Sequence, residues 1–524
     1  MTAAPQRGTE NHTAAAGTVH DAGVRCARPG RASVMASSTP TPYDGLDRMP
    51  IAGSWRPGSS EKTATDTDPY TGETLTELRL ADADDLDQAY ARAKEAQRDW
   101  AGRLPSERAE VMRRAAAIME ARKDEIVDWH IRESGAAAPA AAFEFAITVR
   151  DFHEASSYPY RVEGRILPAD IEGKESRVYR RPVGVVAVIS PWNVPMHLSN
   201  RSVAPALALG NAVVLKPAGD TPVTGGLLLA KVYEEAGLPE GLLSVVIGSG
   251  SEIGDAIVSH PTPRVVSFTG STPVGKGIAE KAGLKKLSLE LGGNGPLVVL
   301  DDADLGYAVD AAIFGKFFHQ GQVCMITNRI VVHSSVHDEF VDRYVERARS
   351  LKAGDPREDD TVIGPIINAK QLEGIQEKVA QARSDGADQL LGGDPTGPIG
   401  SVLPPHVLLG TNDVATARQE VFGPVVTIIR ARDEDDALAI ANDTEYGLSS
   451  AVFTEDTERG VRFALRVEAG MTHVNDSPLN DENNTAFGGE KESGLGRFGG
   501  EWAIDEFTTD HWVSVQHTRR QFPF

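Results

Sequence analysis

Cysteine is scarce in this chain: only Cys26 and Cys324 occur among 524 residues. Two cysteines cannot build the disulfide framework of a small secreted domain, and such scarcity is typical of a reducing compartment. The chain also lacks any uninterrupted apolar run of the roughly 18 residues that a membrane-spanning helix needs. We therefore expect a cytoplasmic protein without a membrane partner.

Basic residues are also in short supply. The chain has 53 Lys and Arg residues against 75 Asp and Glu residues, which gives a formal net charge of −22. An acidic surface keeps a protein in solution and repels the phosphates of nucleic acids, so no nucleic-acid partner is expected. The length of 524 residues is too great for one hydrophobic core and predicts two or three domains.

Residues 1–40 differ in composition from the rest of the chain. They are rich in Ala, Thr, Gly, Arg and Pro, contain no Lys and have no apolar stretch. We predict that this segment is a disordered tail. Two explanations stay open: an extension upstream of a start at Met35, or a transit peptide, because acidic residues are few and Arg recurs.

Short apolar strands alternate with helical segments in the middle of the chain. Residues 183–189 form an apolar run that ends at Ser-Pro, as is typical of a strand buried on both faces. Strand–helix alternation predicts βαβ units and a parallel sheet. The pattern indicates a nucleotide-binding region over about residues 180–290 and a second α/β region over roughly residues 293–490.

Two glycine-rich loops each follow a predicted strand and open a predicted helix. Helix N-termini bind phosphate because their backbone N–H groups are free and the helix dipole is positive there. Neither loop matches G-x-G-x-x-G or the P-loop pattern, so each is a weak signal alone. Their candidate residues are Gly248, Gly250, Gly254, Gly270, Ser271 and Gly275.

Five further residues could carry chemistry, and each has an ordinary alternative. Cys324 alone is more typical of a buried, inert cysteine. Glu290 ends an apolar strand, where it is either solvated or held as a general base. Asn193 in "SPWNVP" is either an oxyanion donor or part of an Asx turn. Lys216 and Glu420 are either ligand contacts or surface charges.

Taken together, these segments are specific. The motifs "PWNVP", "GNAVVLKP", "SFTGSTPVG", "LELGGNGP", "GQVC", "EVFGPV" and "FGGEKESGLGR" resemble the aldehyde dehydrogenase superfamily. The resemblance covers about residues 50–515, and the 34-residue interval between Glu290 and Cys324 matches the family pattern.

The resemblance implies a catalytic role for three residues. Cys324 would attack the aldehyde carbonyl to give a thiohemiacetal, and hydride transfer to a nicotinamide would leave a thioester. Asn193 and the backbone N–H of Cys324 would stabilise the oxyanion. Glu290 would activate the water that hydrolyses the thioester. No metal ligands are implied.

The resemblance also implies a bound NAD. Lys216 matches the lysine that reaches the adenosine ribose, and Glu420, with Phe422 beside it, matches the carboxylate that holds the nicotinamide ribose. Ser271 and Trp192 match pyrophosphate contacts. The remaining candidates are glycines of the two loops and two residues that would line the nicotinamide pocket: Gly250, Gly254, Gly270, Gly275, Ile189 and Leu291.

One departure from the family pattern concerns the choice between NAD and NADP. Many NAD-preferring members carry Glu three residues after the lysine, where a carboxylate binds the ribose 2′-hydroxyl and repels a 2′-phosphate. Here that position is Gly219, followed by Asp220. We expect NAD, with NADP as an alternative cofactor.

The resemblance implies an α/β fold of the aldehyde dehydrogenase type. Residues 41–160 and 183–292 would form a Rossmann-type NAD-binding domain, and residues 293–490 the catalytic domain. Residues 161–182 and 505–524 would form a small β element through which the chain assembles as a homodimer or homotetramer.

Finer features are similar to the bacterial benzaldehyde and vanillin dehydrogenase branch, which implies an aromatic aldehyde substrate. The segments that carry this are "GQVCMITNR", "HVND" and "GRFGGEWAIDEFTTDHWVSVQH". Arg201 has two alternatives: it would bind a phenolic or acidic substituent of the substrate, or it would form a salt bridge elsewhere. Phe318 and Phe487 likewise would either line the substrate tunnel or pack in the core. The substrate-tunnel candidates are Val194, Leu198, Arg201, Phe318, Val323, Met325 and Phe487.

Three alternatives stay open. The first is a substrate other than an aromatic aldehyde, namely an aliphatic aldehyde, a betaine aldehyde or a semialdehyde. A catalytically idle relative would have lost Cys324 or Glu290, and both are present. A member that passes the thioester to coenzyme A would usually lack Glu290, so its presence favours hydrolysis.

Overall fold

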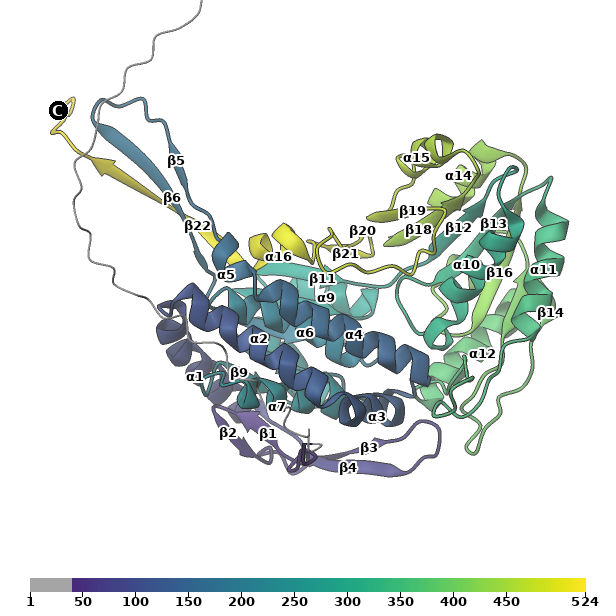
Figure 1. Cartoon of the computed structure of the whole chain (residues 1–524), viewed down its shortest axis with the longest axis horizontal. Helices are drawn as coiled ribbons and strands as arrows, with labels where there is room; N and C mark the ends of the chain where they lie inside the picture. Colours follow the sequence, from purple (N-terminus) through teal and green to yellow (C-terminus); the bar gives the residue numbers. More distant parts are fainter. Residues whose placement is uncertain (1–39) are drawn as a thin grey trace, which may run out of the picture. The chain divides into compact units, whose positions relative to one another are not determined.

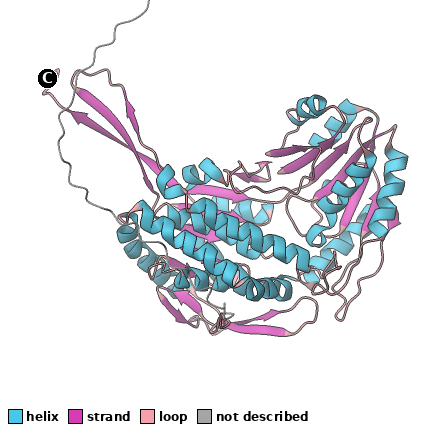
Figure 2. Ribbon diagram, in the orientation of Figure 1, coloured by secondary structure: helices cyan, strands magenta, loops and turns pink. Residues whose placement is uncertain are grey.

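The computed structural model describes residues 40–524 (Figure 1 and Figure 2). The predicted tail, apart from Pro40, lies outside the described residues, and so does Cys26. Within residues 40–524, two mainly parallel sheets, helices around them and a three-stranded antiparallel ribbon confirm the predicted α/β fold. None of the described helices is long and apolar enough to cross a membrane.

The first sheet contains the strands predicted between residues 183 and 290. Its order is β21-β11-β10-β7-β8-β9, with only β21 antiparallel to its neighbour. Ile189 pairs with Lys216, and Thr269 pairs with Glu290, so all four lie at the carboxyl edge, where open parallel sheets bind ligands. The strands are β7 Val185–Ile189, β8 Ala212–Lys216, β9 Leu243–Val245, β10 Val265–Thr269, β11 Lys286–Glu290 and β21 Gly494–Leu495.

Helices cover this sheet, and α6 is buried along its whole length. It contacts α4 as well as β7 and β8 of the sheet, so that α4 comes close to the residues that follow β7. Figure 1 shows α4 and α6 among the helices beside this sheet. The helices are α1 Ala83–Ala101, α2 Pro105–Ala121, α3 Lys123–Ser134, α4 Ala138–Ala155, α5 Tyr158–Arg161, α6 Pro195–Ala208, α7 Leu228–Glu235, α8 Asp255–Ser259, α9 Thr272–Lys281 and α16 Gly500–Phe507, with π-helical turns η1 Val223–Leu227 and η2 Gly250–Gly254.

The second sheet has the order β14-β15-β16-β13-β12-β18-β19, and only β14 is antiparallel to its neighbour. Apolar clusters pack on it, which explains the continuous apolar runs of its central strands. Its strands are β12 Gly295–Val299, β13 Thr327–His333, β14 Asp388–Leu391, β15 His406–Leu409, β16 Val425–Ala431, β18 Ser449–Phe453 and β19 Met471–Val474. Its helices are α10 Leu305–Phe317, η3 Phe318–Gly321, α11 His337–Arg349, α12 Ala369–Ser384, α13 Ala415–Arg418, α14 Glu434–Asn442 and α15 Thr457–Ala464.

The antiparallel ribbon has the order β22-β6-β5 and joins two segments far apart in the sequence. Its strands are β5 Arg165–Leu167, β6 Lys174–Pro182 and β22 Thr508–Gln516. Ile166 and Trp512 on this ribbon are 75% and 65% exposed. The remaining strands pair as β1 Met49–Ile51 with β2 Ser54–Arg56, β3 Thr63–Thr67 with β4 Thr74–Arg79, and β17 Tyr446–Gly447 with β20 Glu490–Lys491. The assignment of these parts to separate domains stays a prediction.

Candidate active site

Cys324 lies where two cavities meet. It is in the loop between η3 and β13 and is half-buried. One cavity, of about 620 Å³, lies toward α4 and α6, and we refer to it as the inner cavity. The other, of about 710 Å³, lies along the carboxyl edge of the first sheet, and we refer to it as the edge cavity. Cys324, Asn193 and Leu198 line both, so two ligands could reach the same sulfur atom from different sides.

The inner cavity brings together every predicted tunnel residue: Val194, Leu198, Arg201, Phe318, Val323, Met325 and Phe487. Its wall also includes residues that sequence reasoning missed, which come mainly from α4 and from the loop segment 479–481. These are Ala136, Ala140, Phe143, Glu144, Ile147, His197, His319, Leu479 and Asp481. No spacing in the sequence links α4 with residues 479–481, so no local signal could have found the wall residues of these two segments, whereas His197 and His319 directly adjoin the predicted Leu198 and Phe318.

Glu290 is completely buried at the end of β11, and neither carboxyl oxygen has a hydrogen-bond partner among the described residues. The solvated alternative is therefore wrong. Burial raises the pKa of Glu290 to about 8; the charge of Asp481 adds to this rise, and the charges of Arg201 and Arg497 oppose it. Glu290 is thus a carboxyl group that holds its proton at neutral pH and can release it just above.

The thiol of Cys324 is electrostatically linked to Glu290. Burial raises the pKa of Cys324 above its ordinary value, and the charge of Glu290 raises it further, while Arg201 opposes the rise. The thiolate is therefore rare while the site holds only protein groups. Attack on a carbonyl carbon therefore requires that the thiol first lose its proton.

The loop before Cys324 has a strained backbone. His319 and Gln320 adopt φ values of 50° and 46°, in the left-handed region that non-glycine residues rarely enter. Gln320 is held in place because its side-chain amide donates to the carbonyl oxygens of Gly135 (3.0 Å) and Pro365 (2.9 Å). These contacts fix a turn that the sequence pattern did not predict.

Asn193 is tied to this loop by two reciprocal hydrogen bonds. The side-chain Nδ2 of Asn193 donates to the backbone carbonyl oxygen of Gln322 at 2.9 Å. The backbone carbonyl oxygen of Asn193 accepts from Nε2 of His319 at 2.6 Å. One N–H of the Asn193 amide remains, and the backbone N–H of Cys324 donates no hydrogen bond within residues 40–524. Both predicted oxyanion donors thus lie at the junction of the cavities.

The edge cavity collects part of the predicted cofactor set: Trp192, Gly270, Ser271, Leu291, Glu420 and Phe422. The remaining candidates, Ile189, Lys216, Gly250, Gly254 and Gly275, do not line it. Ile189 and Lys216 end neighbouring strands, Gly250 and Gly254 bound η2, and Gly275 in α9 packs against Leu291, whose side chain lies 2.3 Å from the position of an added Cβ. Pro191, Thr269, Gly292, and Gln371 and Lys378 of α12 also line this cavity and were not predicted.

The edge cavity, together with residues at the carboxyl end of β8 that do not line it, fits a dinucleotide. Ser271 is the N-cap residue of α9, and its side chain makes no capping hydrogen bond, so the free N–H groups at this helix end suit a pyrophosphate. Lys216 is largely buried, and burial lowers its pKa. Such an ammonium group is stabilised when a ligand oxygen accepts from it. At Gly219, an added Cβ would meet nothing within 4 Å.

Gly293 allows the segment after Glu290 to pass directly beside Cys324. A Cβ at residue 293 would lie 2.2 Å from the carbonyl oxygen of Cys324, which no side chain tolerates. The N–H of Gly293 donates to Oε1 of Glu420 at 2.8 Å, and burial raises the pKa of Glu420. Gly293 in "LELGGNGP" thus reflects close approach rather than flexibility.

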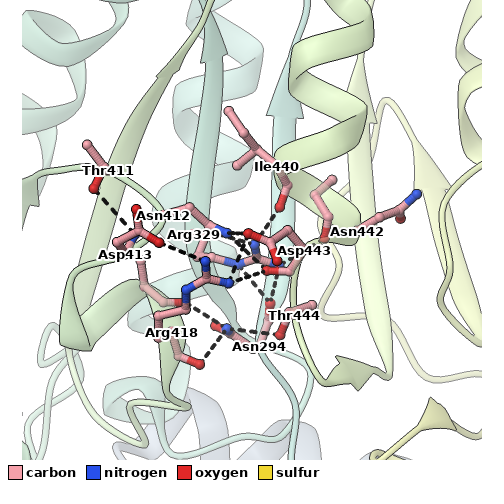
Figure 3. Close-up of polar contacts among 12 residues, drawn as sticks. Asn294, Arg329, Thr411, Asn412, Asp413, Arg418, Ile440, Asn442, Asp443 and Thr444 are labelled. Atoms are coloured by element: carbon pink, nitrogen blue, oxygen red, sulfur yellow. Dashed lines mark hydrogen bonds and ion pairs between the residues drawn. The ribbon is translucent and has the colours of Figure 1, made fainter.

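A buried arginine anchors this same segment (Figure 3). Arg329 in β13 is completely buried, and its Nε and Nη2 donate to the carbonyl oxygen of Asn294 at 3.3 and 3.2 Å. Its Nη1 donates to Oδ1 of Asn412 (3.0 Å) and to the carbonyl oxygen of Ile440 (2.8 Å). Since Asn294 follows Gly293, Arg329 fixes the connection between the two sheets at the site.

The fold and this junction define an α/β enzyme with a nucleotide-type sheet on one side and one sulfur atom between two cavities. The chain matches the aldehyde dehydrogenase family over residues 55–513, and it belongs to that family. The predicted resemblance is confirmed, and the protein is an aldehyde dehydrogenase.

Several relatives are similar over nearly the whole chain. A vanillin dehydrogenase of Corynebacterium glutamicum is 48% identical over 89% of this chain and 97% of its own. A benzaldehyde dehydrogenase of Bacillus subtilis is 49% identical over 92% of this chain and 99% of its own. The crystal structure of an NAD-dependent benzaldehyde dehydrogenase from Corynebacterium glutamicum has a TM-score of 0.84 and 44% identity, and covers 91% of this chain and 98% of that one. A salicylaldehyde dehydrogenase from Pseudomonas putida, solved with salicylaldehyde, has a TM-score of 0.88 and 38% identity, and covers 91% of this chain and 99% of that one.

Proposed function

We propose that this enzyme oxidises aromatic aldehydes to carboxylic acids with NAD. The observation that carries the proposal is the position of Cys324 on the walls of both cavities. An aldehyde in the inner cavity and a nicotinamide in the edge cavity would meet at this sulfur atom. The names of the similar vanillin and benzaldehyde dehydrogenases support the aromatic class.

The proposed reaction begins at Cys324. The thiol proton leaves to solvent, the sulfur attacks the carbonyl carbon, and the electron pair of the C=O bond moves to oxygen. The remaining N–H of Asn193 and the backbone N–H of Cys324 hold this oxyanion. Bound NAD supplies the hydride acceptor, and loss of hydride leaves a thioester on Cys324. Ionised Glu290 then accepts a proton from water, which attacks the thioester. Glu290 returns this proton to the departing sulfur, so that the acid is released and the thiol is restored.

Aromatic side chains favour a ring-shaped substrate. Phe143 stands at the cavity wall, 38% exposed, with its ring edge-on to Phe318 at 5.4 Å between centroids. The ring of Phe314 lies 5.2 Å from that of Phe318. Most other wall residues are apolar, and such a surface binds aromatic rings better than small hydrated aldehydes.

The substrate class is tested with benzaldehyde and vanillin against acetaldehyde, betaine aldehyde and succinate semialdehyde. We expect kcat/KM for the aromatic compounds to exceed that for the others by about tenfold or more, since burying a ring in the inner cavity contributes several kcal/mol. NADH absorbance measures each rate. A preference for any of the three non-aromatic aldehydes would contradict the aromatic assignment.

The choice of nucleotide is tested at Gly219. Asp220 does not replace the missing carboxylate freely, because its Oδ1 accepts from Nδ2 of Asn368 at 3.1 Å. We expect Gly219→Glu to lower kcat/KM for NADP by about tenfold to a hundredfold while NAD is little affected, because a carboxylate repels the 2′-phosphate. Gly219→Gln is the neutral control of equal size. Equal losses with both nucleotides in the Glu variant would place this position outside the ribose site.

We further propose that the ribbon β22-β6-β5 pairs copies of the chain into a homodimer or homotetramer. Its exposed apolar side chains, Ile166 and Trp512 among them, are of the kind that subunit contacts bury. The outer strands of the ribbon also leave backbone groups free for pairing.

A further inference from the structure

One end of the inner cavity is polar, in contrast with its apolar walls. Three charged side chains line this end: His197, Arg201 and Asp481. The same three residues also line a neighbouring cavity of about 390 Å³, which includes Asp151. They therefore form a partition between the inner cavity and this neighbouring cavity.

His197 cannot serve a ligand because both ring nitrogens are in use. Its Nδ1 lies 2.9 Å from Oδ2 of Asp151, and its Nε2 lies 3.1 Å from Oδ2 of Asp481. Burial lowers the pKa of His197, but the charges and hydrogen bonds of the two carboxylates outweigh it and bring the pKa to about 10. His197 is therefore an imidazolium that fixes the orientation of Asp481.

Asp481 keeps one oxygen free. Its side chain is 12% exposed, and Oδ1 accepts no hydrogen bond from any described residue. Burial raises the pKa of Asp481, but the hydrogen bond and charge of His197, with the charges of Arg201 and Arg150, lower it below its ordinary value. Asp481 thus presents an ionised acceptor to the inner cavity.

Arg201 supplies donors beside this acceptor. It is 7% exposed, and its Nη2 donates to Oγ1 of Thr269 at 2.9 Å. Its guanidinium lies over the rings of Phe487 (5.0 Å) and Phe498 (4.3 Å). Neither Nε nor Nη1 has a hydrogen-bond partner among residues 40–524, although an unpartnered buried donor of this charge is costly. A ligand oxygen would satisfy them.

We propose that Asp481, with Arg201, recognises a hydroxyl group on the aromatic ring of the substrate. A phenol both donates and accepts: its O–H donates to Oδ1 of Asp481, and its oxygen accepts from Arg201. The assignment rests on the proposed aromatic aldehyde oxidation and narrows it to hydroxylated benzaldehydes. An aldehyde that bears a carboxylate would be repelled by Asp481.

The variant Asp481→Asn tests this assignment. Because the charge of Asp481 also acts on Cys324 and Glu290, the readout is the ratio of kcat/KM for a hydroxybenzaldehyde to kcat/KM for benzaldehyde, in which general effects cancel. The hydroxybenzaldehyde is the isomer (2-, 3- or 4-) that the wild type uses best. We expect the ratio to fall about tenfold to a hundredfold, as for loss of a hydrogen bond to a charged group.

The matched control is Asp151→Asn, which removes the other carboxylate on His197 but does not line the inner cavity. We expect its ratio to equal that of the wild type. An unchanged ratio in Asp481→Asn, or an equal fall in both variants, would overturn the assignment. If the wild type oxidises no aromatic aldehyde, both the proposed function and this assignment are overturned. If the wild type oxidises benzaldehyde well but the ratio in Asp481→Asn is unchanged, only the assignment is overturned.

A second measurement needs no variant. The phenolate form of the substrate has lost its donor and faces the charge of Asp481, so the wild-type ratio should fall about tenfold per pH unit above the phenol pKa. Benzaldehyde, which has no phenol, corrects for the titration of the enzyme. A ratio that stays level or rises with pH would mean that Arg201 binds the phenolate, and would overturn the role of Asp481.

Discussion

Cys324→Ala is expected to lower aldehyde-dependent NADH formation by about 10⁴-fold or more, because the nucleophile acts as a unit with its base and oxyanion donors. Alanine removes only the sulfur atom from a loop held by other contacts. Those contacts include the hydrogen bonds of Gln320 to Gly135 and Pro365 and that of Asn193 to Gln322. The loop and the edge cavity should therefore survive, and NAD binding, measured by calorimetry, should be unchanged.

The control for this variant is Cys26→Ala, since Cys26 is the other cysteine of the chain. It should keep wild-type activity, which separates loss of the sulfur at residue 324 from general sensitivity to thiol removal. Activity retained in Cys324→Ala, or lost equally in both variants, would contradict the role of Cys324.

Glu290→Gln is expected to separate the two halves of the reaction. Without a base for water, the thioester should persist, and steady-state turnover should fall by roughly 10²–10⁴-fold. Because the thiol proton leaves to solvent and not to Glu290, rapid mixing should still show a burst of NADH close to one per site before the reaction stalls. Glutamine has the same size as glutamate, so the buried pocket at the end of β11 should keep its packing.

The pH dependence gives the same variant a second readout. Glu290 must be ionised to accept a proton, and burial raises its pKa to about 8. Wild-type turnover should therefore rise as the pH increases through about 8, and the Gln variant should lose this limb of the profile. Glu290 would titrate between about pH 6 and pH 9. Wild-type turnover that stays constant over this range would contradict the role of Glu290 as the base.

Sequence patterns predicted the parts of the molecule that depend on local regularity. Buried parallel strands such as β7 and β8 are continuous apolar runs, and the loops after β10 and β11 carry the glycines that close approach requires. The seven tunnel candidates also line one cavity. Apart from Phe487, they lie near the motifs that carry Asn193 and Cys324 in the sequence, and both of these residues line the same cavity.

Other features depend on contacts that no local pattern encodes. His197 and Asp481 are separated by 284 residues, and a single Asp in a polar loop gives no periodic signal. The strand β21 has only two residues, too few for an alternation to be visible. The left-handed backbone of His319 and Gln320 is imposed by tertiary hydrogen bonds, against the preference of both residue types.

The most direct test of the account is the intact mass of Glu290→Gln after mixing with NAD and an aromatic aldehyde, followed by acid quenching. We predict an added mass equal to one acyl group, located on Cys324 by peptide mapping and absent when the aldehyde or NAD is omitted. An unmodified chain after a full burst of NADH, or an acyl group on another residue, would contradict a thioester at Cys324 that Glu290 normally clears.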